Sequence, residues 1–334
     1  MKLLRSIAVA YLYFPHVWFV RIIGPRLAVL FSRLIAWCNW LLTFFGAERK
    51  AYQAISESLP ELETKLSARS ILLRYLQMKH QNLVEWLVYP TKRGRRYSRQ
   101  VFAEIEGREY LDSTVQDGNG AILAVYHFGL VKLGFAVLED AGYVVPQHVI
   151  RGKSYAGLTY NCIADAVMNR LVDIEIASGS KPFYHKPMET MVALVRHVRG
   201  GGILGMNADG MGGEKFVDAP FLQGTLSLPL GPAQVAAYTG APLIPMFAFD
   251  EGLFQHRLVL HAPIYVTDDT SDSLNEAVFK YAKILEDYVK LCPWQWWTWR
   301  RITLMEKNGA EHYHIQGLPT DETYWSSRAS LTTA

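Results

Sequence analysis

The stretch AILAVYHFGLVK at residues 121–132 decides how this chain is expected to fold. Its first six residues form a short continuous apolar run, which is typical of a strand buried on both faces of a sheet. His127 follows that run, Gly129 marks a sharp turn, and the residues after it resume a helical pattern. We therefore predict a strand, a turn and a helix, with a histidine at the carboxyl end of the strand.

Short apolar runs alternate with helical patterns along the rest of the chain. Further strands are predicted at residues 144–150, 174–176, 202–206, 242–249 and 256–260, and further helices at 158–171, 188–197, 233–238 and 274–290. This alternation predicts an α/β fold with a mixed sheet covered by helices. We place the α/β body at residues 115–305, a helical lead-in at 51–114 and a polar tail at 306–334.

The first fifty residues are expected to be membrane-anchoring apolar helices. Residues 6–20 are short for a span, since a helix needs ~20 apolar residues to cross a bilayer. Residues 27–45 reach that length but contain Arg33 and Asn39, so spanning and surface-lying arrangements both stay open. Tryptophans and early basic residues suit an anionic membrane surface. A cleaved signal peptide is the alternative for the first stretch, but no small-residue cleavage site precedes the second stretch, so we expect the first stretch to be retained.

Composition and motif content exclude several classes of function. Half of the residues are hydrophobic and only 19% are charged, which indicates that more than a soluble core is buried. The net charge of +3 comes without any nucleic-acid-binding motif, so no nucleic-acid partner is expected. The three cysteines are far apart and form no CxxC pair, so no metal site is expected. The chain also has no Gly-x-Ser-x-Gly nucleophile elbow.

A histidine at a strand end is by itself weak support for catalysis, because such residues are more often structural. A polar, glycine-rich loop changes the balance: NADGMGG at residues 207–213 directly follows the predicted strand 202–206. Asp209 in this loop could face the same sheet edge as His127, where α/β folds commonly build active sites. The alternative is that Asp209 only forms a turn, since Asp-Gly is a common turn dipeptide.

Three further segments follow in a fixed order: PFLQG at 220–224, GAPLIP at 240–245 and CPWQWWTWRR at 292–301. Together with His-Phe-Gly at 127–129 and the Asp209 loop, they make the chain resemble the lipid A late acyltransferases. This family of lauroyl and myristoyl transferases lies within the broader glycerolipid-type acyltransferases. The resemblance covers about residues 1–305.

The resemblance implies transfer of a fatty acyl group from an acyl carrier protein or coenzyme A thioester to a hydroxyl or amine of a membrane lipid. No cofactor is expected beyond that acyl-thioester co-substrate. A hydroxyl is a poor nucleophile at neutral pH, so His127 is expected to remove its proton as general base. The resemblance also implies an inner-membrane enzyme whose body faces the cytoplasm. The residues expected to bind substrate are Phe128, Gly129, Arg151, Arg170, Asn207 and Arg300.

The sequence departs from the family at Lys132, where the family pattern places Asp or Glu five residues after the histidine. That acid would fix the imidazole tautomer and stabilise the imidazolium, and a lysine does neither. Three interpretations follow. Asp209, or less readily Glu139 or Asp140, orients His127 instead; Lys132 binds a phosphate or carboxylate of an unusual substrate; or the protein is a lipid-binding relative that has lost catalysis.

Overall fold

A computed structural model describes residues 15–42, 48–149, 182–184, 189–210, 215–307 and 309–315, together with residues 173, 213 and 318. These residues form a mixed α/β fold, which confirms the predicted class. The helix predicted at 158–171 and the strand predicted at 174–176 lie outside the described residues.

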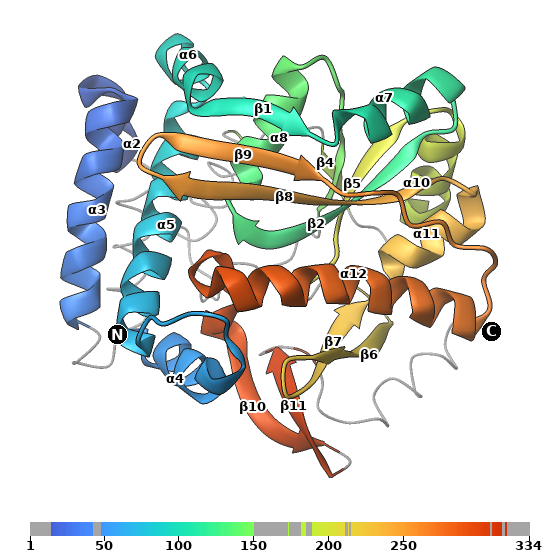
Figure 1. The fold of residues 1–334 in the computed structure, drawn as a ribbon. Helices are drawn as coiled ribbons and strands as arrows, with labels where there is room; N and C mark the ends of the chain where they lie inside the picture. Colours follow the sequence, from blue (N-terminus) through green and yellow to red (C-terminus); the bar gives the residue numbers. More distant parts are fainter. Residues whose placement is uncertain are drawn as a thin grey trace.

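The main sheet has seven strands in the order β1-β9-β8-β2-β5-β3-β4 (Figure 1). The bounds are β1 Phe102–Glu106, β2 Ala121–Gly129, β3 Gln147–Val149, β4 Pro182–Tyr184, β5 Ile203–Asn207, β8 Leu243–Gly252 and β9 Gln255–Leu260. All neighbouring strands pair in parallel except β8 and β9, which form an antiparallel hairpin. The predicted strand that ends in His127 is β2, and it lies between β8 and β5 at the centre of the sheet.

Helices cover the sheet on both faces. They are α2 Pro15–Ile23, α3 Pro25–Leu42, α4 Arg49–Ser58, α5 Ala68–Val88, α6 Lys92–Val101, α7 Arg108–Asp117, α8 Val131–Asp140, α10 Glu189–Arg199, α11 Gly231–Thr239 and α12 Ser271–Leu291. One hydrophobic cluster joins the sheet to α11 and α12, and a second joins it to α6, α8 and the end of α5. Short 3-10 turns, η2 at Leu59–Glu61, η3 at Pro293–Gln295 and η4 at Trp297–Arg301, complete the fold.

A second sheet of four strands, in the order β10-β11-β7-β6, was not expected from the sequence. Its strands are β6 Phe216–Phe221, β7 Gly224–Pro229, β10 Ile302–Lys307 and β11 Ala310–Ile315. It lies across α12 from the main sheet in Figure 1. The prediction of a polar tail from residue 306 is therefore wrong for β11. Tyr313 and Ile315 are buried, and that burial explains why this short polar stretch is ordered as a strand.

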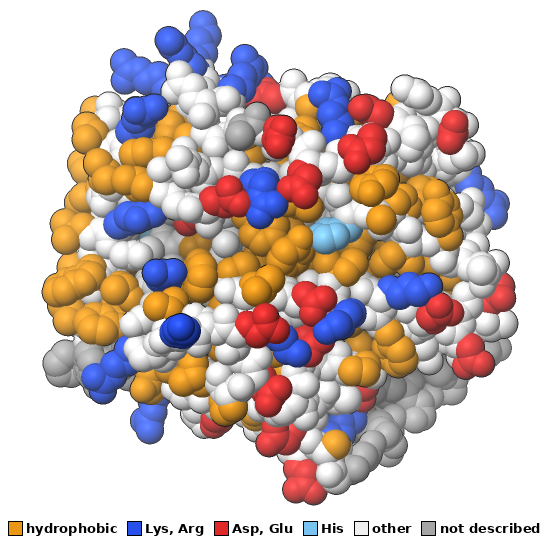
Figure 2. Space-filling model, in the orientation of Figure 1, with side chains coloured by type: hydrophobic (Ala, Val, Ile, Leu, Met, Phe, Trp, Pro, Cys, Tyr) orange, Lys and Arg blue, Asp and Glu red, His pale blue; other side chains and the backbone are white. Residues whose placement is uncertain are grey.

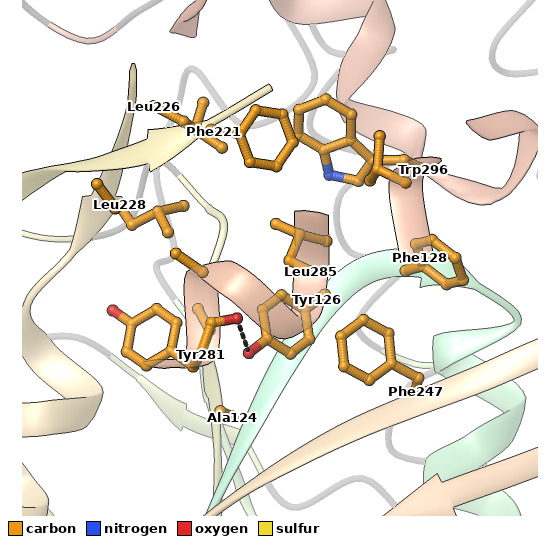
Figure 3. Packing of buried hydrophobic residues seen from close by; sticks show 14 of the residues in the cluster. Ala124, Tyr126, Phe128, Phe221, Leu226, Leu228, Phe247, Tyr281, Leu285 and Trp296 are labelled. Atoms are coloured by element: carbon orange, nitrogen blue, oxygen red, sulfur yellow. Dashed lines mark hydrogen bonds between the residues drawn. The ribbon is translucent and has the colours of Figure 1, made fainter. Parts of the chain in front are cut away.

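The centre of the molecule is built around the alternation of side chains along β2. Even-numbered residues from 122 to 128 enter the cluster with α12, and odd-numbered residues from 121 to 125 enter the cluster on the other face. Figure 3 shows Tyr126 between Phe247 and Tyr281 in the first cluster. The Tyr126 hydroxyl donates a hydrogen bond of 3.1 Å to the Tyr281 carbonyl, so the buried polar group is satisfied. The strand that carries His127 is thus rigidly packed.

The N-terminal helices α2 and α3 pack against α5 on one side of the molecule. Buried residues 28, 29, 32 and 36 of α3 face α5, while large apolar side chains of α3 at 27, 30, 34, 37 and 41 are exposed at alternating spacings of three and four. The polar residues that interrupt this apolar run turn inward: Arg33 donates to Gln81, and Asn39 bonds His80. Figure 2 shows hydrophobic side chains gathered over α3.

Among the described residues, no helix combines the length and the apolar character that crossing a bilayer requires.

Candidate active site

The candidate site forms where the central strands β2 and β5 end. The parallel ladder between them runs to the pair Val125 and Asn207, and the Ala208 amide then donates to the Val125 carbonyl. On its other side β2 loses register with β8 between Val125 and Gly129. Such irregularities redirect side chains, and they often occur next to active sites. This one contains His127, whose backbone N–H is left for a partner outside the ladder.

Asp209 provides that partner, and it also contacts the imidazole. Its Oδ1 accepts a hydrogen bond of 2.9 Å from the His127 backbone N–H and lies 2.8 Å from the ring Nδ1. A carboxylate only accepts hydrogen bonds, so this contact places the ring proton on Nδ1 and leaves a lone pair on Nε2. The loop after β5 therefore brings an acid to the histidine from 82 residues away.

The second oxygen of Asp209 is held by the C-terminal tryptophan-rich segment. Oδ2 accepts hydrogen bonds from Trp296 Nε1 at 3.0 Å and from Thr298 Oγ1 at 3.4 Å. The Asp209 side chain is fully buried. Burial of a carboxylate is costly unless donors surround it, and these donors hold it in one orientation. The sequence of this tryptophan-rich segment gives no signal that it supports Asp209.

The His127 ring is partly exposed. Its side chain is 27% exposed, and Nε2 has no hydrogen-bonding partner among the described residues. A Cβ atom added at Gly210 would lie 3.3 Å from Cε1 of the ring and 3.2 Å from Cβ of Asn207, so all three residues are neighbours. The Trp297 ring lies 6.3 Å away, centroid to centroid. Of the residues predicted to bind substrate, Asn207 is thus placed beside the histidine, with its side chain exposed.

Phe128 and Gly129 hold the end of β2 in place. The Phe128 side chain is buried among Phe247, Phe249 and Tyr288, so it points into the core and not toward open space. Gly129 has φ of +52°, and an added Cβ would lie 1.9 Å from the Ala248 carbonyl oxygen. Only glycine tolerates that conformation and that approach. This burial leaves only the backbone of Phe128 for the expected role in substrate binding, and that role stays a prediction.

Lys132 lies in the first turn of α8, and its ammonium is 5.5 Å from the centre of the Trp86 ring, a cation–π contact with α5. The two alternative acids on α8 do not reach the histidine. Asp140 at the end of the helix pairs with Arg99 at 3.2 Å, and Glu139 beside it is exposed. Of the three acids considered in the sequence, Asp209 is the one in contact with His127.

The arginines expected to bind substrate are only partly described. Arg151 and Arg170 lie outside the described residues. Arg300, in η4, is half-exposed and its Nε lies 3.6 Å from Oε2 of Glu48. Burial raises the pKa of the Glu48 carboxyl, but Lys79 and Arg300 beside it bring that pKa below its usual value. Arg300 is therefore paired with an acid of the α4 region and is not among the contacts of His127 and Asp209.

This arrangement can take up and release one proton at a defined atom. Nε2 is available to accept it, and the buried carboxylate at Nδ1 stabilises the imidazolium that results. Across the described residues, no group of three or more His, Cys, Asp or Glu side chains could hold a metal ion.

Residues 2–302 match the family described as bacterial lipid A biosynthesis acyltransferases. The chain belongs to this family. The match runs from the N-terminal helices to the end of η4, so it includes both strands of the candidate site and the tryptophan-rich segment that supports Asp209. The resemblance seen in the sequence motifs is thereby confirmed.

Curated relatives carry a related acyltransferase name. The chain is 25% identical over 172 residues to "Phosphatidylinositol mannoside acyltransferase" of Mycobacterium tuberculosis, strain CDC 1551 / Oshkosh, and equally to the protein of that name in strain ATCC 25618 / H37Rv. The match spans 49% of this chain and 49% of each relative, so the chain covers about half the length of the curated relatives it matches. The description of the family and the names of these relatives both give an acyltransferase of a lipid.

Proposed function

We propose that this chain transfers a fatty acyl group from a thioester of acyl carrier protein or coenzyme A to a hydroxyl or amine of a membrane lipid. The observation that carries the proposal is the contact between His127 Nδ1 and the buried carboxylate of Asp209, in a member of an acyltransferase family. This contact supports an active enzyme over a lapsed relative, because it supplies the orienting acid that Lys132 cannot provide.

The proposed reaction uses one histidine in two steps. Nε2 of His127 removes the proton of the acceptor hydroxyl while the oxygen attacks the thioester carbonyl carbon. The C–S bond then breaks, and the imidazolium returns the proton to the departing thiolate. Asp209 keeps the ring in the productive tautomer and stabilises its positive charge through both steps. The proposed steps involve neither a metal ion nor a redox group.

The oxyanion formed during attack needs positive charge nearby. The helix α8 begins at Val131, four residues after His127, and Lys132 lies in its first turn. The positive N-terminal end of α8 is thus the nearest source of stabilisation along the chain, while the Leu130 amide before it already donates to the Ala248 carbonyl. In this proposal Lys132 adds positive charge at that helix end, and does not replace the family's acid.

We also propose that the chain acts at the inner, cytoplasmic membrane with its body facing the cytoplasm, where acyl-thioesters are made. The support is the exposed apolar face of α2 and α3, with Trp18, Ile22, Leu27, Leu34 and Trp37 turned outward. Contiguous apolar surface of this kind marks an interaction site, and an amphipathic helix with tryptophans suits the depth of the lipid headgroups. The enzyme would then meet its acceptor in the plane of the bilayer.

An acyl-transfer assay tests the proposal. Purified, detergent-solubilised protein is incubated with radiolabelled lauroyl, myristoyl and palmitoyl thioesters of acyl carrier protein and of coenzyme A. The acceptors are a lipid A precursor, a mannosylated phospholipid and a lysophospholipid. We expect labelled lipid with at least one pair, and loss of that product in His127→Ala. Transfer that persists in His127→Ala would remove the histidine from the mechanism, and thioester hydrolysis without lipid product would argue for a thioesterase.

A further inference from the structure

A pocket unrelated to His127 lies between the start of α3 and the helix α6. Its volume is about 270 Å³. Arg26 contributes from the first turn of α3, and Arg93 and Arg96 contribute from successive turns of α6. Neither Asp nor Glu lines it. Three arginines that line one pocket without a carboxylate form a site for an anion, because an anion beside them replaces their mutual repulsion with attraction.

Aromatic packing fixes one side of this pocket. The Arg26 guanidinium lies 5.4 Å from the centre of the Phe254 ring, at the tip of the β8–β9 hairpin. Phe254 has φ of +66° and packs edge-on against Tyr97, a lining residue, with ring centres 6.1 Å apart. The Tyr97 hydroxyl is anchored in turn by a hydrogen bond of 2.7 Å to Glu85. Arg26 is exposed but keeps this contact with the Phe254 ring.

The other arginines are available to a ligand. Arg93 and Arg96 are three residues apart on α6, so their side chains emerge on the same face of the helix. Both are exposed, and the salt bridges found within the described ranges involve neither of them nor Arg26. Backbone at Gly24 and Pro25, where α3 begins, completes the lining.

The pocket adjoins the apolar face of α2 and α3. Leu27 lines the pocket and is also one of the exposed apolar residues of that face, and Ile22 is exposed five residues earlier, at the end of α2. Figure 2 shows the continuation: hydrophobic side chains gather over α3, and Lys and Arg side chains project beside them over α6. If the apolar face lies in the acyl region of a membrane, the three guanidinium groups lie at the depth of the lipid phosphates.

We propose that this pocket binds the phosphate of an anionic phospholipid headgroup, separately from the acyl acceptor, and so fixes how the enzyme is oriented on the membrane. The proposal rests on the membrane association proposed above, but not on the acyl-transfer chemistry of His127 and Asp209. Guanidinium groups bind phosphate through paired hydrogen bonds, which an ammonium group cannot reproduce. Recognition in the pocket therefore differs from general attraction of positive charge to a negative surface.

Vesicle sedimentation separates these possibilities. The full-length protein is mixed with vesicles of phosphatidylcholine alone, or of phosphatidylcholine with 30% phosphatidylglycerol, and the partition coefficients are compared. The variants are the triple Arg26→Gln, Arg93→Gln, Arg96→Gln, and the triple in which the same residues become Lys. The matched control is Lys65→Gln, Lys215→Gln, Lys280→Gln, which removes three exposed cations elsewhere. Folding of each variant is checked by circular dichroism and thermal unfolding.

The expected result is a loss of at least ~30-fold in partition to anionic vesicles for the Gln triple, since each basic residue near the surface contributes substantially to binding. The Lys triple should lose most of the same preference although it keeps the charge, and the control triple should keep it. Partition to pure phosphatidylcholine should be unchanged in all four proteins, because it reports the apolar face.

Four results would overturn the proposal. The first is a Lys triple that binds as wild type, which would mean diffuse electrostatics. The second is a Gln triple that loses no more than the control. The third is binding of glycerol 3-phosphate or acyl carrier protein to the arginines in the absence of vesicles, as tightly as the protein binds anionic vesicles. That result would assign the pocket to a soluble ligand. Wild-type protein that binds neither kind of vesicle would refute membrane association and this proposal together, while acyl transfer in detergent would still report His127 separately.

Discussion

Oδ1 of Asp209 contacts both the backbone N–H and the ring Nδ1 of His127, at 2.9 and 2.8 Å. One carboxylate oxygen therefore fixes the end of β2 and the tautomer of the imidazole that the strand presents. The other oxygen is bound by Trp296 and Thr298, so the C-terminal segment determines where the acid sits. The position of the proposed base is thus set by three segments that are distant in the sequence.

Asp209→Asn should leave the fold intact and reduce kcat by ~10²–10⁴-fold, because an amide cannot stabilise the imidazolium and favours the wrong tautomer. KM should change little. Steady-state acyl transfer measures both constants. Asp140→Asn is the matched control, since it neutralises an acid that pairs with Arg99 away from the histidine. If Asp209→Asn kept its activity within about threefold of wild type, the assigned role of Asp209 would be lost.

Lys132 gives a second prediction. If Asp209 is the orienting acid, Lys132→Gln should lower kcat by less than ~10-fold, since it removes positive charge near the start of α8 and the contact with Trp86 but keeps the pair of His127 and Asp209. Lys132→Glu should bring no gain, because Nδ1 of His127 is already bonded. Both variants are measured in the same acyl-transfer assay. A Lys132→Glu protein that is far more active than wild type would instead support a lapsed enzyme repaired by the family's acid.

A buried polar cluster beside α5 makes stability depend on pH. Nε2 of His256 lies 3.0 Å from Glu85, and its Nδ1 lies 3.6 Å from Asp250. Burial raises the pKa of Asp250 to about 6, although the charge of His256 partly offsets that rise. Burial alone lowers the pKa of His256, but Glu85 and Asp250 beside the ring bring that pKa above its usual value. Both folded-state pKa values exceed the unfolded ones, so the folded protein holds more protons than the unfolded chain. Stability is therefore lost as pH rises, first through about 4 to 6 as Asp250 ionises, and then through the folded pKa of His256.

Asp250→Asn tests this sign. Below about pH 4 the wild-type group is neutral in both states, so the variant should be equally stable. Above pH 6 the variant should be more stable by ~1–3 kcal/mol, because it avoids an ionised buried carboxylate. Urea unfolding at pH 4, 6 and 8 gives the free energies. If the Asn variant instead loses stability relative to wild type between pH 4 and pH 8, the ionised pair with His256 stabilises the fold.

The exposed face of α3 gives a prediction for membrane binding. Leu30→Glu with Leu34→Glu should reduce partition to phosphatidylcholine vesicles by ~10–100-fold, since two large apolar side chains leave the bilayer surface. The control Val192→Glu alters an equally exposed apolar residue on α10. Vesicle sedimentation reports both. Equal losses in the two proteins would mean that α3 has no special part in binding.

The centre of the fold was predictable from the sequence because burial on both faces leaves a clear signal. The runs that became β2, β5 and β8 are largely apolar, and α12 has a clear helical period. The strand β1 and the second sheet were missed since their strands are short and mix polar with apolar residues, as in β6, whose sequence is Phe-Val-Asp-Ala-Pro-Phe. The strand β6 packs against α12, a contact that no local pattern encodes.

The candidate site was predictable in part. His127 and Asp209 each follow an apolar strand, and parallel neighbouring strands bring their carboxyl ends to one edge, so their proximity followed from the fold class. The hydrogen bonds from Trp296 and Thr298 to Asp209 could not be predicted from the fold class, because a tryptophan in an apolar segment predicts core packing equally well. The convergence of Arg26 with Arg93 and Arg96 depends on how α3 and α6 meet, and the sequence holds no sign of it.

A double-mutant cycle of His127→Ala, Asp209→Ala and the combined variant tests the central claim most directly. Single-turnover acyl transfer from a radiolabelled thioester gives the rate for each protein, with thermal unfolding as the check on folding. If the two residues act as a unit, each single variant should lose most of the activity and the combined variant should lose no more than the worse single one. Losses that multiply, or a His127→Ala protein with the wild-type rate, would contradict the account.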